Sequence, residues 1–423
     1  MEKFIVEGGH RLTGNISVSG SKNSALPILA ASLLSREPST IHNLPKLFDI
    51  QTMLQILQTL GVKVNRNSEH SITIHPETLT STEAPYDLVR KMRASICLLG
   101  PLLGRTKKAT VSMPGGCVIG PRPVDLHIRA FRDMHANISI EHGYIKADGR
   151  DMRGAYIFLS GRFGSSVLAT ANCMMVATLT PGITILEGTA CEPEIVDLAT
   201  FLIKMGAHIE GAGSPTIKII GQDELQGAEH TIIPDRIEAG TFMIAAAITG
   251  GTVSIQNAKK QHLFALIDHL RRMGVKITTV NDVITVSTDG AIKSMDIVTL
   301  PYPGFPTDLQ AQMMALLCIS DGISIITEKV FPERFIHISE LNRLGAQIAL
   351  EGPNAIVKGM CHLSAAPIMS SDLRASAALV LAGMIAEGST HIHRIYHIDR
   401  GYEGLEKKLN LLGANIKRVQ ERE

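Results

Sequence analysis

The sequence predicts an α/β protein built from six repeats of about 70 residues, and three observations lead to this fold class. A short pattern recurs along the whole chain: an apolar residue, Gly, then Ala or Val, any residue, and Ile or Val. Its second position falls at 61, 135, 206, 274, 345 and 413, at intervals of 74, 71, 68, 71 and 68 residues. Helical and strand-like stretches alternate between the copies. Such a period exceeds that of solenoid repeats and indicates a small α/β subdomain.

Each copy of the pattern predicts the end of one helix and the start of a strand. The stretch before it is amphipathic, as at 199–204 and 405–411. Glycine at a helix C-terminus enters the left-handed conformation without steric cost, and the β-branched residues that follow favour a strand. The copy at 134–138 is degenerate and reads MHANI, with His135 at the second position.

A second helix, rich in small residues, precedes most copies, for example at 238–247. Strand signals follow such helices at 182–185, 251–255 and 322–325. Small side chains allow helices to approach closely, so we expect these helices to be buried side by side. Six such units would form either one ring or two globules of three, with a crossing between halves near 230–234.

Composition and charge exclude several classes of protein. Of 423 residues, 45% are hydrophobic, which supplies a large core and excludes a disordered chain. Lys and Arg number 41 and Asp and Glu 40, so a net charge of +1 argues against bulk nucleic-acid or membrane-surface binding. The apolar runs are shorter than the roughly twenty residues that span a bilayer, and no signal-peptide pattern is visible. We therefore expect a cytoplasmic protein.

The six cysteines show neither a CxxC pair nor zinc spacing, which predicts unpaired thiols in a reducing compartment. Cys97, Cys173 and Cys318 fall within apolar helical patterns and are expected in the core. Cys117 differs, because it lies in the Gly- and Pro-rich stretch PGGCVIGP, five residues before Arg122. Exposure and a nearby cation favour a reactive thiol, so Cys117 is a candidate acid or nucleophile.

Lys22 follows the turn VSGS and opens the first small-residue helix. Backbone N–H groups, the helix dipole and the ammonium group would converge there, which suits a phosphate. The stretch does not match the Walker A pattern. The alternative interpretation is a solvated lysine at a helix start.

Arginine and aspartate recur at the junctions between repeats. Asp235, Asp308 and Asp372 open small-residue helices, and the simplest interpretation of each is N-capping. Several arginines at one end of a two-lobed protein would instead form a cleft for a multiply anionic ligand. His391 and His393 alternate on a strand, but no third ligand stands at metal spacing, so no metal site is expected.

Taken in chain order, these motifs resemble those of the enolpyruvyl transferases, and the resemblance extends over essentially the entire chain. It implies a two-domain inside-out α/β barrel, the enolpyruvyl transferase fold, crossed twice by the chain. The first domain would span 22–230 and the second 1–21 with 231–423. The motifs are GSKN at 20–23, MRAS at 92–95, PGGC at 114–117, RPVDLH at 122–127, EPEIVD at 192–197, PDRIE at 234–238, FPTDLQ at 305–310, DLRA at 372–375 and HIDRGY at 397–402.

The resemblance is to the branch of the family that acts on UDP-N-acetylglucosamine. It implies transfer of enolpyruvyl from phosphoenolpyruvate to the sugar 3′-hydroxyl, with release of phosphate, by addition and elimination through a tetrahedral intermediate. This is the first committed step of peptidoglycan synthesis, and so serves cell wall biogenesis, cell shape and cell division. The implied partners are these two small molecules, without a metal or an organic cofactor.

Catalytic roles follow from the resemblance alone. Cys117 would deliver a proton to the methylene carbon of phosphoenolpyruvate. Asp308 would accept or position the proton of the sugar hydroxyl. The Gly-rich stretch around Cys117 suggests that this cysteine lies on a lid, which closes when the sugar nucleotide binds.

Binding roles are implied in the same way. The phosphate would be held by Lys22, Arg122 and Arg400, and the carboxylate by Arg334 and Arg374. Asn23 would hydrogen-bond the tetrahedral intermediate. The run SSVL at 165–168 departs from the family at Leu168, where glycine is common. Contacts to the nucleotide sugar are implied for Arg93, Arg122, Pro123, Val124, Asp125, Leu126, Ser166, Val167, Asp308 and Val330.

Three other interpretations remain open at the level of sequence. The sister branch, which acts on shikimate 3-phosphate, shares the fold but lacks a cysteine-bearing loop of this form. A non-catalytic relative could bind a sugar nucleotide or a protein as a regulator. An RNA-end-processing enzyme on a related repeat fold would be expected to show histidine chemistry and a basic surface. The Cys117 motif argues against the shikimate 3-phosphate branch, and the presence of Cys117, Lys22, Asp308 and Arg400 together favours an enzyme over a non-catalytic relative.

Overall fold

The structure of the chain, a computed structural model, describes residues 2–113, 124–360 and 362–420. They form two compact units. The middle unit comprises 20–113 and 124–233, and the terminal unit comprises 2–19 and 234–420. The chain enters the middle unit after Ser19 and leaves it after Ile233, so the two ends of the chain belong to one unit.

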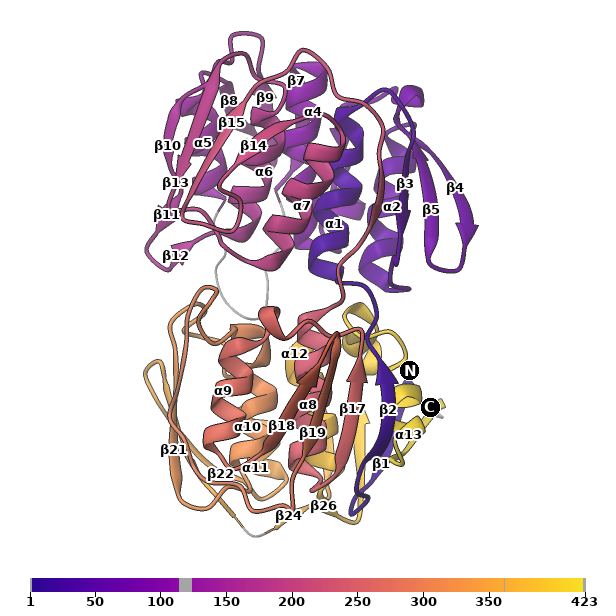
Figure 1. The fold of residues 1–423 in the computed structure, drawn as a ribbon, viewed down its shortest axis with the longest axis vertical. Coiled ribbons are helices and arrows are strands. Elements are labelled where there is room, and N and C mark those ends of the chain that lie inside the picture. Colours follow the sequence, from indigo (N-terminus) through magenta and orange to yellow (C-terminus); the bar gives the residue numbers. More distant parts are fainter. Residues whose placement is uncertain (1, 114–123, 361, 421–423) are drawn as a thin grey trace. The chain divides into compact units, whose positions relative to one another are not determined.

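Helices occupy the centre of each unit and strands its periphery (Figure 1). In the middle unit the helices are α1 (Lys22–Ala31), α2 (Phe48–Thr59), α3 (Tyr86–Val89), α4 (Leu99–Thr106), α5 (Asp125–Asp133), α6 (Val167–Ala177) and α7 (Pro193–Lys204), with 3₁₀ turns at Ser32–Leu34, Pro76–Thr78 and Arg93–Leu98. In the terminal unit they are α8 (Arg236–Ile248), α9 (Phe264–Arg272), α10 (Gln310–Leu317), α11 (Ile338–Arg343), α12 (Leu373–Gly383) and α13 (Leu405–Leu411), with 3₁₀ turns at Lys260–His262, Thr307–Leu309 and Ile395–Arg400.

Six four-stranded sheets in the described ranges share one pairing scheme, in which the first two strands are parallel and the other neighbours antiparallel. Three of these sheets belong to the middle unit. In spatial order their strands are β16 (Glu229–Thr231), β3 (Ser39–His42), β5 (Ser71–His75) and β4 (Lys63–Ser68) in one sheet; β6 (Glu83–Ala84), β7 (Lys108–Ser112), β9 (Tyr144–Asp148) and β8 (Asn137–Glu141) in the next; and β10 (Tyr156–Phe158), β13 (Ile183–Glu187), β15 (Thr216–Ile220) and β14 (His208–Glu210) in the third. The other three sheets belong to the terminal unit. In spatial order their strands are β2 (Thr13–Ser17), β17 (Thr252–Gln256), β19 (Val283–Ser287) and β18 (Lys276–Val280) in one sheet; β20 (Ile297–Thr299), β21 (Ile323–Glu328), β23 (Asn354–Lys358) and β22 (Gln347–Glu351) in the next; and β25 (Pro367–Met369), β27 (Ser389–His393), β1 (Glu2–Glu7) and β28 (Asn415–Gln420) in the third. Two-stranded ribbons are formed by β11 (Ser160–Gly161) with β12 (Gly164–Ser165), and by β24 (Leu363–Ser364) with β26 (Ala386–Glu387).

The repeated sequence pattern marks the same place in each sheet. Its second residue has a positive φ in all six copies, from +66° at His135 to +101° at Gly206 and Gly413. The edge strand of the sheet begins two residues later in every copy. Glycine adopts this backbone conformation readily, whereas His135 adopts it at a steric cost. The α/β class predicted from the sequence is confirmed, and the pattern is the turn from a helix into an edge strand.

The small-residue helices form the cores of the two units. Residues 237–248 of α8 are all buried, as are nearly all residues of α1, α10 and α12. At Gly100 a β-carbon would stand 2.6 Å from the backbone oxygen of Asn172, so α4 and α6 approach to within backbone contact there. Absence of a side chain at Gly100 therefore sets the spacing of these two helices, as expected for helices buried side by side.

The expected core cysteines are buried. Cys97, Cys173 and Cys318 are each 0% exposed, and burial raises the pKa of the Cys97 and Cys318 thiols to about 12. Cys117 lies outside the described residues.

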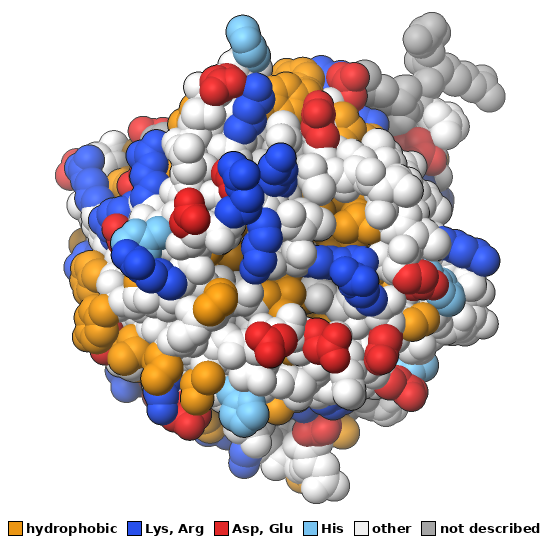
Figure 2. Space-filling model, turned by 90° about the horizontal axis from the view of Figure 1, so that it is seen from above, with side chains coloured by type: hydrophobic (Ala, Val, Ile, Leu, Met, Phe, Trp, Pro, Cys, Tyr) orange, Lys and Arg blue, Asp and Glu red, His pale blue; other side chains and the backbone are white. Residues whose placement is uncertain are grey.

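Within the described part of the chain, none of the helices combines the length and the apolar character needed to cross a membrane. On the face shown in Figure 2, basic, acidic and apolar side chains are interspersed, in keeping with the balanced net charge.

Candidate active site

Most candidate residues in the described ranges lie at the starts of the buried helices. Lys22 is the first residue of α1, and Arg93 opens the 3₁₀ turn that runs into α4. Ser166 is the N-cap of α6, where its side chain accepts a hydrogen bond from the Ala169 backbone. Asp308 lies in the 3₁₀ turn before α10, and Arg374 is the second residue of α12. Cys117, Arg122 and Pro123 lie outside the described residues.

The three aspartates that open helices have two different roles. Asp235 caps α8 by accepting from the Ile237 and Glu238 backbone, and Asp372 caps α12 by accepting from the Arg374 and Ala375 backbone. N-capping, the simplest interpretation, is therefore confirmed for these two. Asp308 makes no such cap, because its carboxylate contacts arginines instead.

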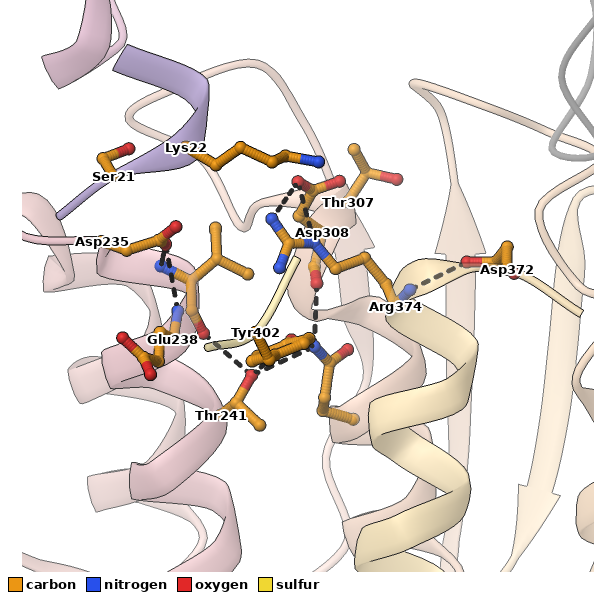
Figure 3. A network of polar contacts seen from close by, with 12 residues as sticks. Ser21, Lys22, Asp235, Glu238, Thr241, Thr307, Asp308, Asp372, Arg374 and Tyr402 are labelled. Atoms are coloured by element: carbon orange, nitrogen blue, oxygen red, sulfur yellow. Dashed lines mark hydrogen bonds and ion pairs between the residues drawn. The ribbon is translucent and has the colours of Figure 1, made fainter. Parts of the chain in front are cut away.

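Asp308 contacts two buried arginines of the terminal unit, Arg334 and Arg374, and Figure 3 shows the contact with Arg374. Its Oδ1 accepts from Arg334 Nη1 at 2.9 Å, and its Oδ2 accepts from Arg374 Nε and Nη2 at 3.3 and 3.2 Å. The side chains of Arg374 and Arg334 are 2% and 6% exposed, and that of Asp308 is 26% exposed. The carboxylate is thus fixed from behind by both cations and still reaches solvent on one side.

Arg374 has a further donor besides the two that bond to Asp308. In the described ranges its buried Nη1 has no hydrogen-bond partner. The guanidinium lies over the ring of Tyr402, with Cζ 5.3 Å from the ring centroid. A buried guanidinium nitrogen without an acceptor is costly, and an anionic ligand would satisfy it. Arg374 therefore keeps a buried donor whose chemistry suits an acidic ligand.

Tyr402 lies below this cluster in Figure 3, and Gln312 links it to Asp308 through hydrogen bonds. The Tyr402 hydroxyl lies 2.9 Å from Thr241 Oγ1, which itself donates to the Ile237 carbonyl, so Tyr402 is the donor of the pair. Gln312 Nε2 donates to the Tyr402 hydroxyl at 3.0 Å and to the Asp308 carbonyl at 3.0 Å. Burial raises the pKa of Tyr402, so its hydroxyl stays protonated. The starts of α8, α10 and α12 are thereby tied together.

Two other candidates of the terminal unit lie close to these helix starts. Arg400 ends the 3₁₀ turn Ile395–Arg400. The next residue, Gly401, packs so closely on Leu373 at the start of α12 that a β-carbon would stand 2.3 Å from that side chain. Val330 is half-buried just after β21. The structure therefore places Arg400 and Val330 on segments that adjoin the helix starts.

Lys22 is not a solvated lysine. It is 9% exposed, and its Nζ forms an ion pair at 3.1 Å with Oδ2 of Asp49, which is 3% exposed. Ser21 caps the helix by accepting from the Ser24 backbone. Nothing in the sequence pattern distinguishes Asp49 from other acidic residues of a helical first turn. The ion pair became apparent only from the packing of α2 against α1.

The motif EPEIVD anchors the start of α1 through Asp197. Its carboxylate accepts from the Ser24 hydroxyl, from the Ile233 backbone at 3.3 Å, and pairs with His230 Nε2 at 2.9 Å. Asp197 and His230 are 5% and 3% exposed. Asp197 therefore joins α1, α7 and the segment at which the chain leaves the middle unit.

The residues implied in nucleotide-sugar contact adjoin a second buried network. Asn172 Oδ1 accepts from the Gly100 backbone, and its Nδ2 donates to the Ile96 carbonyl and to His127 Nδ1 at 3.0 Å. His127 is therefore a neutral imidazole protonated on Nε2. Burial lowers the pKa of His127 to about 3, with a smaller contribution from the charge of Arg93.

Val124, Asp125 and Leu126 precede His127 at the start of α5. The Leu126 side chain approaches Gly161 in the ribbon of β11 and β12, 3.5 Å from the position of a β-carbon there. That ribbon leads directly to Ser166 and Val167 at the start of α6. The structure thus brings these five candidates together, while Asn23 follows Lys22 on α1.

No cluster of three or more histidine, cysteine, aspartate or glutamate side chains suited to a metal occurs within the described ranges. The terminal unit offers a fixed carboxylate with the buried cations Arg334 and Arg374, and the middle unit, taken by itself, offers the buried cation Lys22. Buried cations favour phosphate or carboxylate ligands.

Comparison with known proteins places this fold and these motifs in one family. The sequence profile described as EPSP synthase (3-phosphoshikimate 1-carboxyvinyltransferase) matches residues 6–409. The chain belongs to this family, the enolpyruvyl transferases. Its resemblance to that family, seen in the motifs, is thereby confirmed.

Two relatives match over almost their full length. The UDP-N-acetylglucosamine 1-carboxyvinyltransferase of Desulfatibacillum aliphaticivorans is 53% identical over 420 residues, covering 99% of this chain and 100% of the relative. The enzyme of the same name from Methylacidiphilum infernorum is 53% identical over 419 residues, covering 99% of each chain.

Solved structures share the fold. The enolpyruvyl transferase NikO from Streptomyces tendae superposes with a TM-score of 0.90 at 25% identity, covering 100% of this chain and 99% of that one. EPSP synthase from Acinetobacter baumannii superposes with a TM-score of 0.77 at 17% identity, covering 99% and 100%. The enolpyruvyl transferase fold predicted for this chain is thus confirmed.

Proposed function

We propose that this protein transfers the enolpyruvyl group of phosphoenolpyruvate to the 3′-hydroxyl of UDP-N-acetylglucosamine and releases phosphate. The observation that carries the proposal is the full-length identity of 53% to relatives named for this reaction. The cluster of Asp308, Arg334 and Arg374 supports it, because the reaction needs a fixed proton acceptor beside cations that bind an acidic substrate.

Phosphoenolpyruvate has two acidic groups, and the candidate cations divide between them. Arg374 binds the carboxylate through its remaining donor, with Arg334 beside it. Lys22, Arg122 and Arg400 bind the phosphate. Buried guanidinium groups suit this role because they stay charged and can form paired hydrogen bonds.

The chemistry proceeds in two stages. In the addition, Cys117 gives a proton to the methylene carbon, the sugar oxygen bonds to the neighbouring carbon, and Asp308 accepts or positions the hydroxyl proton. Asn23 hydrogen-bonds the resulting tetrahedral intermediate. In the elimination, the methyl group gives a proton back to the Cys117 thiolate, the bond from carbon to the phosphate oxygen breaks, and phosphate leaves with that electron pair. Cys117 thus alternates between thiol and thiolate.

The nucleotide sugar contacts the second set of candidates. Arg93 supplies a cation for the diphosphate, and the starts of α5 and α6 bind the remainder. The GlcNAc ring lies near Val330 and Asp308. Under this proposal the reaction takes place in the cytoplasm, where the product enters peptidoglycan synthesis. The contact residues of the middle unit are Arg93, Arg122, Pro123, Val124, Asp125, Leu126, Ser166 and Val167.

The test measures phosphate released from phosphoenolpyruvate by the wild type and by Cys117→Ala. We expect release that requires UDP-N-acetylglucosamine and that the substitution abolishes. Shikimate 3-phosphate is offered in a parallel reaction, because the family profile bears the name of the enzyme of that branch. Release with shikimate 3-phosphate alone would replace the proposal by that activity, and release with neither acceptor would refute it.

The role of Cys117 has its own control. Cys117→Asp also carries a transferable proton and should retain activity with an altered pH profile. If Cys117→Asp binds both substrates but is inactive at every pH, proton delivery from this position is contradicted.

A further inference from the structure

Glu328 is a completely buried carboxylate close to the cluster of Asp308 and Arg334. It is the last residue of β21 and is 0% exposed. A buried carboxylate is costly unless hydrogen bonds satisfy it. The partners of Glu328 therefore show what its burial achieves.

Four neutral donors surround Glu328. Oε1 accepts from the Thr299 hydroxyl at 2.5 Å and from the backbone N–H groups of Val330 and Phe331, both at 2.9 Å. Oε2 accepts from the Thr307 hydroxyl at 2.9 Å. Thr299 ends β20 and also accepts from the Lys329 backbone at 3.1 Å. One carboxylate thus fixes the end of β20, the turn after β21 and the 3₁₀ turn that contains Asp308.

The hydrogen bonds continue to Asp308 in a defined direction. Because the Thr307 hydroxyl donates to Glu328, its lone pairs are left to accept from Arg334 Nη1, which lies at 3.0 Å. The second hydrogen of the same Nη1 is donated to Asp308 Oδ1 at 2.9 Å. Glu328 therefore sets the orientation of the Thr307 hydroxyl, and this hydroxyl helps to set the orientation of Arg334.

We propose that Glu328 is a positioning residue for the reaction: it holds Asp308, through Thr307 and Arg334, and Val330 in their working positions. This inference rests on the proposed function, and the family motifs assign no role to Glu328. Two of its contacts go to the backbone of the Val330 turn and one to the residue preceding Asp308. These contacts link Glu328 to three candidate site residues, Val330, Arg334 and Asp308. A carboxylate that only stabilised a turn would not need such links.

The middle unit supplies a control at the equivalent position of another sheet, where the glutamate is half-buried rather than fully buried. Glu187 ends β13 opposite Phe158, as Glu328 ends β21 opposite Thr299. Its carboxylate also accepts from two hydroxyls, those of Tyr156 at 3.1 Å and Thr216 at 2.9 Å. Neither hydroxyl belongs to a candidate site residue, and neither leads to an arginine among the described residues.

The experiment compares Glu328→Gln and Glu187→Gln in steady-state kinetics with both substrates. The amide removes one acceptor oxygen, so Thr307 or the Val330 turn loses its anchor. We expect Glu328→Gln to lower kcat on the order of ten- to a hundredfold, as misplaced catalytic groups do, while KM for UDP-N-acetylglucosamine changes by no more than about twofold. Glu187→Gln should leave both constants unchanged. A wild-type kcat in Glu328→Gln would overturn the inference.

A double substitution separates positioning from general loss of structure. If Glu328 acts through Asp308, Glu328→Gln adds little to the loss already caused by Asp308→Asn. A full multiplicative loss in the double variant would show a structural role alone and would overturn the inference.

A second variant covers the case in which Glu328→Gln does not fold. Thr307→Val removes the hydroxyl that joins Glu328 to Arg334 and keeps the side-chain shape. We expect the same fall in kcat, and an unchanged kcat would contradict the proposed chain of contacts. A wild type that releases no phosphate with UDP-N-acetylglucosamine refutes the proposed function, whereas an active wild type beside a fully active Glu328→Gln refutes this inference alone.

Discussion

Arg374 donates two hydrogen bonds to a single oxygen of Asp308, while Arg334 donates to the other oxygen. Both arginines are buried, and they come from segments that lie 66 and 26 residues from Asp308 in sequence. This arrangement fixes the orientation of the carboxylate before any substrate binds. Fixed orientation, with the remaining exposed side of Asp308 turned to solvent, is the property that a proton acceptor in the proposed reaction needs.

Asp308→Asn is expected to lower kcat about a hundredfold or more, since general acid–base groups contribute about 10²- to 10⁴-fold. The amide keeps the shape of the side chain but cannot accept from both arginines. Steady-state phosphate release measures the effect. Asp148 provides the control: it ends a strand, its half-buried carboxylate accepts from Arg150 at 2.9 and 2.6 Å, and Asp148→Asn should retain wild-type kcat. Equal losses in both variants would contradict a special role for Asp308.

Arg374→Lys is expected to raise KM for phosphoenolpyruvate and to lower kcat/KM about ten- to a hundredfold. The reason is that hydrogen bonds to charged groups contribute about 1.5–3 kcal/mol each, and lysine cannot contact Asp308 and a carboxylate in the same paired geometry. Kinetics at varied phosphoenolpyruvate, with saturating nucleotide sugar, measure the change. An unchanged KM for phosphoenolpyruvate would remove Arg374 from the carboxylate site.

Gly100→Ala is expected to destabilise the protein by about 1–3 kcal/mol, as overpacking does, because the new methyl group meets the backbone of Asn172 at 2.6 Å. Gly104 lies on the same helix, but the nearest atom to its β-carbon position is a Leu34 side-chain carbon at 3.4 Å. Gly104→Ala should therefore be neutral or stabilising, because alanine favours a helix over glycine by about 1 kcal/mol. Urea unfolding of the two variants measures the difference, and equal stability would contradict the close approach of α4 and α6.

The buried His127 side chain should lower the free energy of unfolding in mild acid. Its pKa is about 3 in the folded protein, against 6.5 for a solvated histidine in the unfolded chain, so only the unfolded state binds a proton between these pH values. The free energy of unfolding is therefore unaffected above pH 6.5 and falls as the pH is lowered towards 3. From about pH 7.5 to about pH 5.0 this histidine contributes a loss of about 2 kcal/mol.

His127→Gln stays neutral at every pH and should remove that contribution. Urea unfolding of wild type and variant at about pH 7.5 and about pH 5.0 gives the measurement. A variant whose stability falls with pH as steeply as that of the wild type would show that His127 is not the group responsible. His337, whose pKa burial lowers to about 4, adds a similar slope to both proteins and so cancels in the comparison.

Local features of the fold could be predicted from the sequence because they recur. The turn into each edge strand needs a positive φ, and glycine at five of six positions makes this requirement visible. His135 adopts the same conformation, with a φ of +66°, without being glycine, so the repeat persists in the backbone where the sequence pattern weakens. N-caps were equally predictable, because Asp235 and Asp372 act on residues two and three positions away.

The supporting contacts of the site could not be predicted, since they join residues far apart in sequence. Tyr402 meets Thr241 across 161 residues, and Lys22 meets Asp49 across 27. Glu328 resembles any acidic residue at a strand end until β20 and the 3₁₀ turn of Asp308 pack beside it. Motifs identify the groups that perform chemistry, whereas the residues that orient those groups are identified by packing.

The strand β1 lies between β27 and β28, although residues 2–7 are the first of the chain and 415–420 among the last. During synthesis on a ribosome, β1 emerges before the middle unit, whereas both its neighbours, β27 and β28, emerge after that unit. Residues 20–233 can therefore acquire their core while β1 still has both edges unpaired. A truncation that removes β28 leaves β1 unpaired on one edge, so the sheet around β1 is completed only once residues 415–420 have been made.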